Sequence, residues 1–210
     1  MYKRQVIPYV GYARQDRQFL SGEVVTMAIV ARMLQTAGAK KIVAVDIHSK
    51  IALNHFKIPK ENVSAIPELA KYFKKMKLKN ALIVSPHMGG ALRAKKFASL
   101  LNTDFIGLKK SRNRKTGKVL IQSSKVDVRG KDLILVDDII STGGSIVKAA
   151  QFLKRQKCKR VFVACTHGLF VEGAEKKIKK AGVSRVISTN TIPRNTSKVD
   201  ISGVIAESIR

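Results

Sequence analysis

The sequence predicts an α/β fold in which parallel sheets are flanked by helices. Four short apolar runs are rich in β-branched residues, and each ends in a polar cluster. Their hydrophobicity is continuous rather than alternating, which is typical of strands covered on both faces, as in parallel sheets. Segments with apolar residues at helical spacing, and Lys or Arg on the remaining face, separate these runs. A repeated order of strand and helix is the signature of α/β proteins.

The expected elements, in chain order, are helix 22–37, strand 41–48, strand 81–87, helix 90–101, strand 132–138, helix 144–155, strand 160–167 and helix 172–181. The Ile58-Pro59 and Ile66-Pro67 pairs, followed by a basic stretch, mark the best candidate boundary between two domains. We therefore expect a first domain over 1–66 and a second over 67–210, with the last helix packing back on the first domain.

The charge balance is the unusual quantity in the composition. The chain has 210 residues, with 41 Lys and Arg against 14 Asp and Glu, a formal net charge of +27 and a pI near 10.5. This charge favours polyanionic partners such as nucleic acid, anionic membranes or phosphorylated small molecules. Hydrophobic residues make up 45% and charged residues 26%, which argues against a disordered chain, a collagen-like chain or a disulfide scaffold.

The two cysteines and the apolar stretches indicate an unexported protein. Cys158 and Cys165 match no C-x-x-C pattern, so we expect reduced, packed thiols and a reducing, cytoplasmic environment. The first ten residues lack an apolar core of signal-peptide length, and the longest apolar stretch, 24–31, is far too short to span a membrane. No membrane partner is expected.

Three histidines stand where the predicted strands end. His48, His87 and His167 each close an apolar run, and ligands of open α/β sheets bind outside the carboxyl ends of the strands. A single such residue is more simply explained as a hydrogen-bonded histidine at a strand end. Their repetition at corresponding positions weakens that explanation.

The strongest chemical signal is the segment 133–145 (LILVDDIISTGGS). Asp137 and Asp138 end an apolar strand, where desolvation and mutual repulsion both oppose two adjacent carboxylates. Sugar hydroxyls, or water molecules on a magnesium ion, would supply partners that make this arrangement favourable. We therefore expect these acids to serve a ligand.

The turn that follows the acids predicts a phosphate site. Glycines allow a close backbone approach, so the amides of Ser141, Thr142, Gly143, Gly144 and Ser145 and the start of the next helix can converge on one phosphate. The turn is neither a Walker loop nor a dinucleotide-binding G-x-G-x-x-G pattern. An ordinary Ser- or Thr-capped helix start is the alternative, but it explains neither acid.

This loop resembles the phosphoribosyl diphosphate motif of the phosphoribosyltransferase fold. Further segments resemble those of the ribose-phosphate diphosphokinase family, also called phosphoribosyl diphosphate synthetases, namely 9–17 (YVGYARQDR), 45–48 (VDIH), 85–90 (SPHMGG) and 164–168 (ACTHG). The resemblance covers nearly the whole chain, and Ser141 with 110–112 (KSR) is more similar to archaeal than to bacterial members. It implies two similar phosphoribosyltransferase-type domains, the first of them incomplete.

The resemblance also implies an activity, a cofactor and an assembly. The family transfers the diphosphoryl group of ATP to C1 of ribose 5-phosphate, which gives phosphoribosyl diphosphate and AMP, requires Mg²⁺, and forms sites between subunits of a homo-oligomer. Such phosphoryl-type transfer is catalysed mostly by positioning and charge neutralisation.

Residue roles follow from the same resemblance. Arg14, Gln15 and Asp16 would bind ATP, whereas His48 and His87 would stand at the metal. Asp137, Asp138 and the loop from Ser141 to Ser145 would bind ribose 5-phosphate. Lys110 and Arg112 would act in the catalytic loop, although a solvated basic loop is the alternative for this lysine-rich stretch.

The chain departs from the family pattern in two places. The family usually has an Asp at the position of His87, and because Mg²⁺ prefers oxygen ligands over imidazole, we expect weaker magnesium dependence or a shift towards Mn²⁺. Family members usually begin with a longer first domain that includes an acidic Phe-x-Asp-Gly-Glu loop, and the sequence from Met1 onwards has no equivalent of it. We therefore expect a shortened first domain with an unpaired sheet edge, which is either a fragment or a chain that needs a partner to complete its site.

Two other functions stay open. One is a phosphoribosyltransferase that consumes phosphoribosyl diphosphate, against which 12–17 and the His48 segment argue. The other is a catalytically weakened homologue that acts as a regulatory or RNA-binding subunit. Nucleic acid could contact the basic segments 71–79, 154–160 and 176–180, but their roughly helical spacing favours solvated helix faces.

Overall fold

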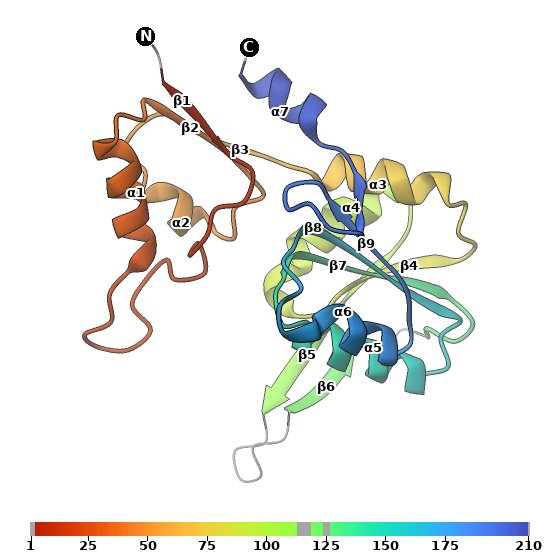
Figure 1. The fold of residues 1–210 in the computed structure, drawn as a ribbon. Helices are drawn as coiled ribbons and strands as arrows, with labels where there is room; N and C mark the ends of the chain where they lie inside the picture. The colour runs from red at the N-terminus through yellow and green to blue at the C-terminus, as the bar shows by residue number, and fades with distance from the viewer. Residues whose placement is uncertain (1–2, 113–118, 124–126, 210) are drawn as a thin grey trace. The chain divides into compact units, whose positions relative to one another are not determined.

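The structure is a computed structural model that describes residues 3–112, 119–123 and 127–209, with no description of the side chains from 110 to 126. It separates into two compact units, shown in Figure 1. Unit 1 comprises Met1–Ala65 and Asp200–Arg210, and unit 2 comprises Ile66–Val199. Within the described ranges, no helix has both the length and the apolar character needed to cross a bilayer.

Unit 1 is a small α/β unit built on a parallel sheet in the order β1-β2-β3. Its elements are β1 (Arg4–Ile7), α1 (Thr26–Thr36), β2 (Lys41–Val45), α2 (Lys50–Asn54), β3 (Lys60–Val63) and α7 (Ser202–Ser208). The end of α7 is tied to this sheet because Lys41 Nζ donates a hydrogen bond to the carbonyl of Ser208 over 3.3 Å. The Arg4 guanidinium bonds the carbonyl of the next residue, Ile209.

Helix α1 forms because its apolar residues recur at helical spacing. Met27 and Ala31, four residues apart, are fully buried in the unit 1 core. The helix begins later than the expected position 22, because the Glu23 carboxylate accepts hydrogen bonds from the backbone amides of Phe19 and Leu20 and so folds the preceding residues into a turn.

Unit 2 contains a sheet in the order β10-β9-β8-β7-β4-β5-β6, parallel except for the antiparallel pair β5 and β6. Its helices are α3 (Ile66–Lys75), η1 (Met88–Gly90), α4 (Ala91–Leu101), α5 (Gly144–Arg155), η2 (Val171–Gly173) and α6 (Ala174–Lys180). Its strands are β4 (Ala81–Ser85), β5 (Phe105–Arg112), β6 (Val119–Ser123), β7 (Asp132–Ile140), β8 (Arg160–Gly168), β9 (Val183–Thr189) and β10 (Ser197–Val199).

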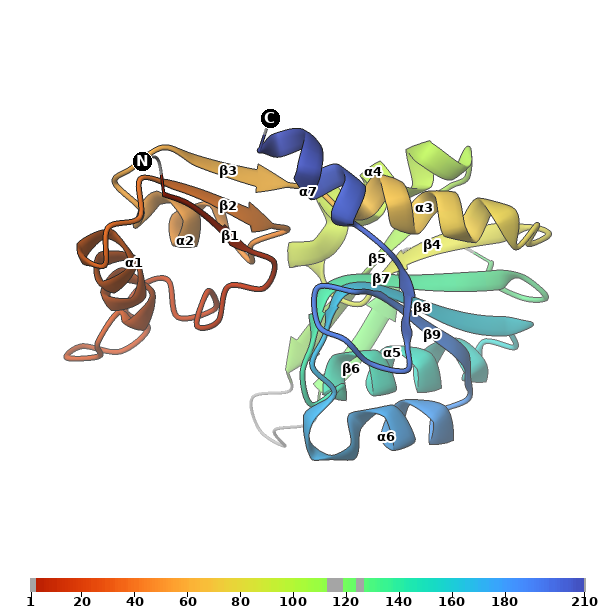
Figure 2. The ribbon, with the colours of Figure 1, turned by 45° about the horizontal axis from the view of Figure 1, so that its top comes forward.

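Helices cover both faces of this sheet. Helices α3 and α4 lie on one face and α5 and α6 on the other, as Figure 2 shows. Strand β7 is central, and all nine of its residues are buried. This two-sided cover explains the continuous apolar runs of the sequence and confirms the predicted α/β fold with parallel sheets flanked by helices.

Strand β7 is longer than the sequence predicted. The expected strand ended at Asp138, whereas β7 continues to Ile140 because its pairing with β8 extends to Ile140 beside Gly168. The two acids therefore lie inside the buried strand rather than at its end. Strand β4 is shorter than expected and ends at Ser85, before His87.

Candidate functional site

The carboxyl ends of β4 and β7 bring the strongest sequence signals together. These two strands are neighbours and run parallel, although a helix and a β-hairpin separate them in sequence. His87 follows β4, and its Nε2 lies 3.5 Å from Oδ1 of Asp137 in β7. The structure thus places His87 beside the acid pair.

Arg93, which the sequence analysis did not single out, completes this cluster. It lies in the first turn of α4, and its Nη2 is 3.1 Å from Oδ2 of Asp138. Its Nη1 is 3.7 Å from Oδ1 of Asp137. A guanidinium that reaches both carboxylates offsets the repulsion between them. Within the described residues, the acids therefore have a protein cation beside them, in addition to any ligand partner.

Backbone amides hold the two carboxylates in fixed orientations. Oδ1 of Asp137 accepts from the amide of Asp138 over 3.0 Å, and Oδ1 of Asp138 accepts from the amide of Ile139 over 2.9 Å. Their side chains are nearly buried, at 4% and 2% exposure of the residues. Such short-range bonds limit rotation, so the site is preorganised.

The acid pair also affects a neighbouring thiol. Cys165 lies beside Asp137 on the adjacent strand β8 and is fully buried. Burial, and then the nearby charges of Asp137 and Asp138, raise the pKa of the Cys165 thiol well above its ordinary value. Cys165 is therefore a packed thiol, as the sequence predicted, and not a nucleophile.

The loop after β7 has the geometry of an anion cradle. Gly143 is the N-cap of α5, has a φ of +75°, and provides no side-chain cap. A Cβ at this residue would lie 3.0 Å from Cδ1 of Ile178 and 3.3 Å from Cβ of Ala174, both in α6. Only glycine fits both constraints. The helix start thus differs from the ordinary Ser- or Thr-capped turn considered for this segment.

The glycines before α4 allow a second close approach. The Ser85 hydroxyl donates to the carbonyl of His87 over 2.6 Å, which closes the turn after β4. A Cβ at Gly90 would lie 2.7 Å from Ser85 Oγ, and one at Gly89 would lie 3.2 Å from Nδ1 of His87. The Gly89-Gly90 pair therefore lets the His87 turn fold against the start of α4.

Comparison with known proteins identifies the family. The model of the N-terminal domain of ribose phosphate pyrophosphokinase matches residues 4–38, and that of the phosphoribosyl synthetase-associated domain matches residues 122–210. A ribose-phosphate pyrophosphokinase of Methanothermobacter thermautotrophicus is 39% identical over 206 residues, which cover 98% of this chain and 71% of that protein. This chain belongs to the ribose-phosphate pyrophosphokinase family.

Other pyrophosphokinases show the same relationship. One from Staphylococcus aureus is 36% identical over 214 residues, covering 97% of this chain, and the chain spans only 66% of that relative's length. The crystal structure of phosphoribosylpyrophosphate synthetase from Mycobacterium smegmatis matches with a TM-score of 0.88 and 31% identity, over 100% of this chain and 70% of the other. An adenine phosphoribosyltransferase of Giardia lamblia, at 16% identity and a TM-score of 0.50, shows likeness of fold alone.

The segment of this pyrophosphokinase-family chain expected to bind ATP lies in unit 1. Arg14 is exposed, and Oε1 of Gln15 accepts from the Thr26 hydroxyl over 2.6 Å. Asp16 is 3% exposed, and its carboxylate accepts a hydrogen bond from the Ser49 hydroxyl at the N-cap of α2. Asp16 therefore holds the turn together, and Arg14 offers the more accessible charge.

His48 and His167 are the other two histidines that the sequence predicts at strand ends. His48 is half-buried and belongs to unit 1. His167 is 1% exposed, and its Nδ1 lies 2.9 Å from Oγ1 of Thr191, so it is the hydrogen-bonded histidine at a strand end. The backbones of Lys110 and Arg112 lie in β5, and their side chains are outside the described residues.

The side-chain donor atoms of the cluster determine which metal ion could bind there. In the described ranges, no group of three His, Cys, Asp or Glu side chains could hold a metal ion. Asp137 and Asp138 supply hard carboxylate oxygens, which fit Mg²⁺ when it is bound by one or two carboxylates, water and substrate phosphates. The imidazole of His87 does not fit Mg²⁺ and suits softer ions better.

Proposed function

We propose that this chain acts as a ribose-phosphate diphosphokinase, which transfers the diphosphoryl group of ATP to ribose 5-phosphate. The proposal rests on family membership and on one structural observation. A preorganised carboxylate pair in β7 lies immediately before a glycine turn that opens a twelve-residue helix. A sugar phosphate carries both hydroxyl groups and a dianionic phosphate, so both features would serve one substrate.

The turn would bind the 5-phosphate. The backbone amides from Ser141 to Ser145 open α5, and a helix N-terminus favours a dianion through its amides and its dipole. Gly143 is buried, whereas Thr142 and Gly144 are exposed, so the loop offers accessible amides beside a buried anchor. The resemblance to the phosphoribosyl diphosphate motif supports the same role.

The acids would orient the ribose. The carboxylate oxygens of Asp137 and Asp138 accept hydrogen bonds from the ribose hydroxyls, and Arg93 holds the pair in place. Mg²⁺, held through water by these carboxylates and by the ATP phosphates, would neutralise the charge on the transferred group. Manganese is the alternative ion that His87 favours.

The reaction itself exchanges one bond to phosphorus for another. The anomeric oxygen of ribose 5-phosphate forms a bond to the β-phosphorus of ATP, the bond from that phosphorus to the α,β-bridging oxygen breaks, and AMP leaves. The proton of the anomeric hydroxyl passes to solvent. Arg14 and Gln15 in unit 1 would orient ATP, and Lys110 and Arg112 would supply positive charge to the transferred phosphoryl oxygens.

The cellular setting of this activity is part of the proposal. A role in nucleotide biosynthesis, a cytoplasmic location and assembly as a homo-oligomer accord with the family. A phosphoribosyltransferase activity has less support, because the likeness to those enzymes extends only to the fold.

Release of AMP from ATP and ribose 5-phosphate in the presence of Mg²⁺ tests the proposal. We expect turnover by the wild-type chain and loss of most of it in Asp137→Asn, because the amide keeps the shape and removes the charge. Asp104→Asn, an exposed acid outside the cluster, is the matched control. Absence of AMP release by the pure wild-type protein would overturn the enzymatic proposal.

A further inference from the structure

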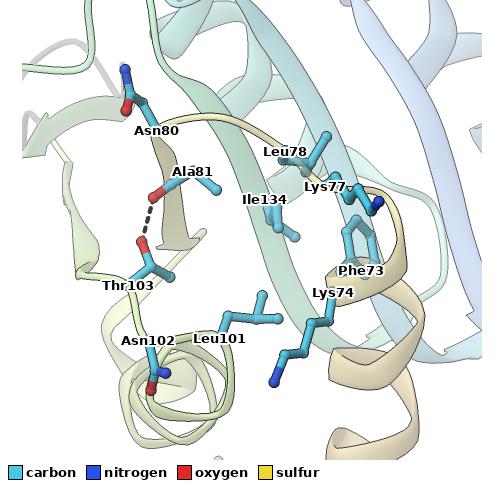
Figure 3. A pocket seen from close by; sticks show the side chains of 10 residues that line it. All are labelled: Phe73, Lys74, Lys77, Leu78, Asn80, Ala81, Leu101, Asn102, Thr103 and Ile134. Carbon is cyan, nitrogen blue, oxygen red and sulfur yellow. Dashed lines mark hydrogen bonds between the residues drawn. The ribbon is translucent and has the colours of Figure 1, made fainter.

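Unit 2 contains a cavity at the amino ends of its central strands, whereas the acid pair lies near their carboxyl ends. It has a volume of about 310 Å³ and is shown in Figure 3. Its lining residues come from the end of α3, the start of β4, the end of α4 and a position near the start of β7, and are Phe73, Lys74, Lys77, Leu78, Asn80, Ala81, Leu101, Asn102, Thr103 and Ile134. This volume is at the small end of the range for ligand sites.

The cavity has an apolar floor. Phe73 and Ile134 are buried, at 2% and 0% exposure, and Leu78 and Leu101 are half-buried above them. The ring of Phe73 is held edge-on by Phe97 at a centroid distance of 5.8 Å, so the floor is rigid. The apolar surface that a ligand can reach therefore belongs to Leu78 and Leu101, with Phe73 and Ile134 packed beneath them.

The rim of the cavity is polar and positively charged. Four lining residues, Lys74, Lys77, Asn80 and Asn102, are exposed, and Figure 3 shows the amide groups of the two asparagines pointing away from the cavity. None of the ten lining residues is acidic. The exposed Asp104 follows the lining directly in sequence, but two further exposed lysines, Lys75 and Lys79, outweigh its charge. The rim therefore favours anions.

One polar side chain of the lining, that of Thr103, already makes a hydrogen bond within the protein. The Thr103 hydroxyl donates a hydrogen bond to the carbonyl of Ala81, the contact drawn in Figure 3. This bond joins the end of α4 to the start of β4 and fixes the two segments that carry Asn80 and Asn102. The exposed side chains of Lys74 and Lys77 are the charged groups of the lining that can turn towards a ligand.

We propose that this cavity, which we call the amino-edge pocket, binds a small organic anion with a planar apolar body and one anionic group. The apolar body packs on Leu78 and Leu101, which are only half-buried, and the exposed side chains of Lys74 and Lys77 turn towards the anion. The proposed diphosphokinase activity uses the other edge of the sheet, so the amino-edge pocket is a separate site. Neither proposal depends on the other.

Phenyl phosphate is a probe that carries both chemical features. Titrated into the ¹⁵N-labelled full chain, it should shift the backbone amide resonances of Lys77, Asn80 and Asn102. Inorganic phosphate and benzyl alcohol, each with half of the chemistry, should produce smaller shifts at the same concentration. The titration is done with excess ribose 5-phosphate, so that the proposed phosphate loop is occupied. Shifts confined to residues 141–145, or shifts at neither place, would overturn the proposal.

Charge-neutral variants show whether the lysines carry the binding. The double variant Lys74→Gln/Lys77→Gln should raise the Kd of phenyl phosphate about fivefold to tenfold, as expected for two partly exposed charge contacts. Lys95→Gln/Lys96→Gln makes the same charge change on the exposed face of α4, outside the lining, and should leave the Kd within about twofold. Equal weakening by both pairs would mean a non-specific charge effect and would contradict the amino-edge pocket.

Discussion

The guanidinium of Arg93 lies 3.1 Å from a carboxylate oxygen of Asp138, and both Asp138 and its neighbour Asp137 are almost fully buried. This contact explains how a strand in the middle of a sheet holds two adjacent acids. Without Arg93, two like charges would face each other in a region of low dielectric. Arg93 therefore neutralises part of the charge of the acid pair before any ligand arrives.

Replacing Arg93 with Met should destabilise the fold strongly. Removing one partner leaves buried charges uncompensated, which costs about 3 kcal/mol of unfolding free energy. Urea denaturation at pH 7 measures the difference. Lys96→Met removes a positive charge from the exposed face of the same helix and should cost far less. Equal losses in the two variants would show that Arg93 does not balance the acid pair.

Gly143→Ala should damage the turn before α5. The substitution places a Cβ at a φ of +75° and 3.0 Å from Ile178, and the left-handed backbone alone costs about 1–2 kcal/mol for a residue other than glycine. Ribose 5-phosphate affinity should fall as well, because the amides of the turn move. Thermal unfolding and calorimetric titration measure the two effects.

Gly144→Ala is the matched control for that variant. Gly144 is the first residue of α5, and the nearest atom to a Cβ there is Thr142 Oγ1 at 4.0 Å. Alanine is a better helix former than glycine, so stability should stay level or rise. If both variants lose the same stability, steric contact with α6 is not the reason for glycine at position 143.

Asp132 and Arg160 should make stability depend on pH. Arg160 Nε and Nη2 bond the two oxygens of Asp132 at 2.8 and 2.6 Å, and this pairing lowers the pKa of Asp132 despite its burial. The contribution is therefore full above the pKa of the unfolded carboxyl, about 4, and is lost as the pH falls through the lower folded value.

The comparison of Arg160→Met with wild type checks this pH dependence. The variant should be less stable at pH 7, and the gap in unfolding free energy should narrow as the pH falls towards 3. Part of this difference in unfolding free energy should persist at every pH, because the Arg160 guanidinium also lies 5.3 Å from the ring centroid of Phe162. Arg185→Met, at an exposed position of the neighbouring strand β9, should show no such gap. A gap that does not change with pH would contradict the assignment.

The sequence predicted the buried strands because a strand that is buried on both faces consists almost entirely of apolar residues. Strands β2, β4, β7 and β8 are covered on both sides and read as continuous apolar runs. Strand β3 (KENV) has no such run, because its residues are exposed or half-buried, and the pattern gave no reason to expect it. Its pairing with β2 is a tertiary property.

The candidate site could also be predicted only as far as its local sequence features allowed. The acids and the glycine turn could be found because each is unusual within its own segment. The role of Arg93 depends on β4 lying next to β7, a pairing of strands that are not consecutive. The one available signal was indirect, since two buried carboxylates in a chain of net charge +27 require a nearby cation.

Cys165 should resist modification until the protein unfolds. Its burial and the two neighbouring carboxylates raise the pKa of the thiol, so the reactive thiolate is scarce even in alkaline buffer. Alkylation by iodoacetamide of a Cys158→Ser variant should be slow from pH 7 to 9 and become rapid in denaturant. The Cys165→Ser variant, which leaves Cys158 at 8% exposure, is the comparison. Rapid alkylation of folded Cys158→Ser would contradict the packing described for β8.

His87→Asp should change the metal preference of the proposed reaction. In the wild type, the imidazole lies 3.5 Å from Asp137 and offers a nitrogen where Mg²⁺ prefers oxygen. The variant should need less Mg²⁺ for half-maximal AMP release, and its ratio of activity with Mn²⁺ to activity with Mg²⁺ should fall. Magnesium-dependent thermal stabilisation gives a readout that does not rely on turnover. His87→Asn, which offers an oxygen without a charge, should lie between the two proteins. Identical metal titrations for wild type and His87→Asp would show that position 87 does not contact the metal or its water shell.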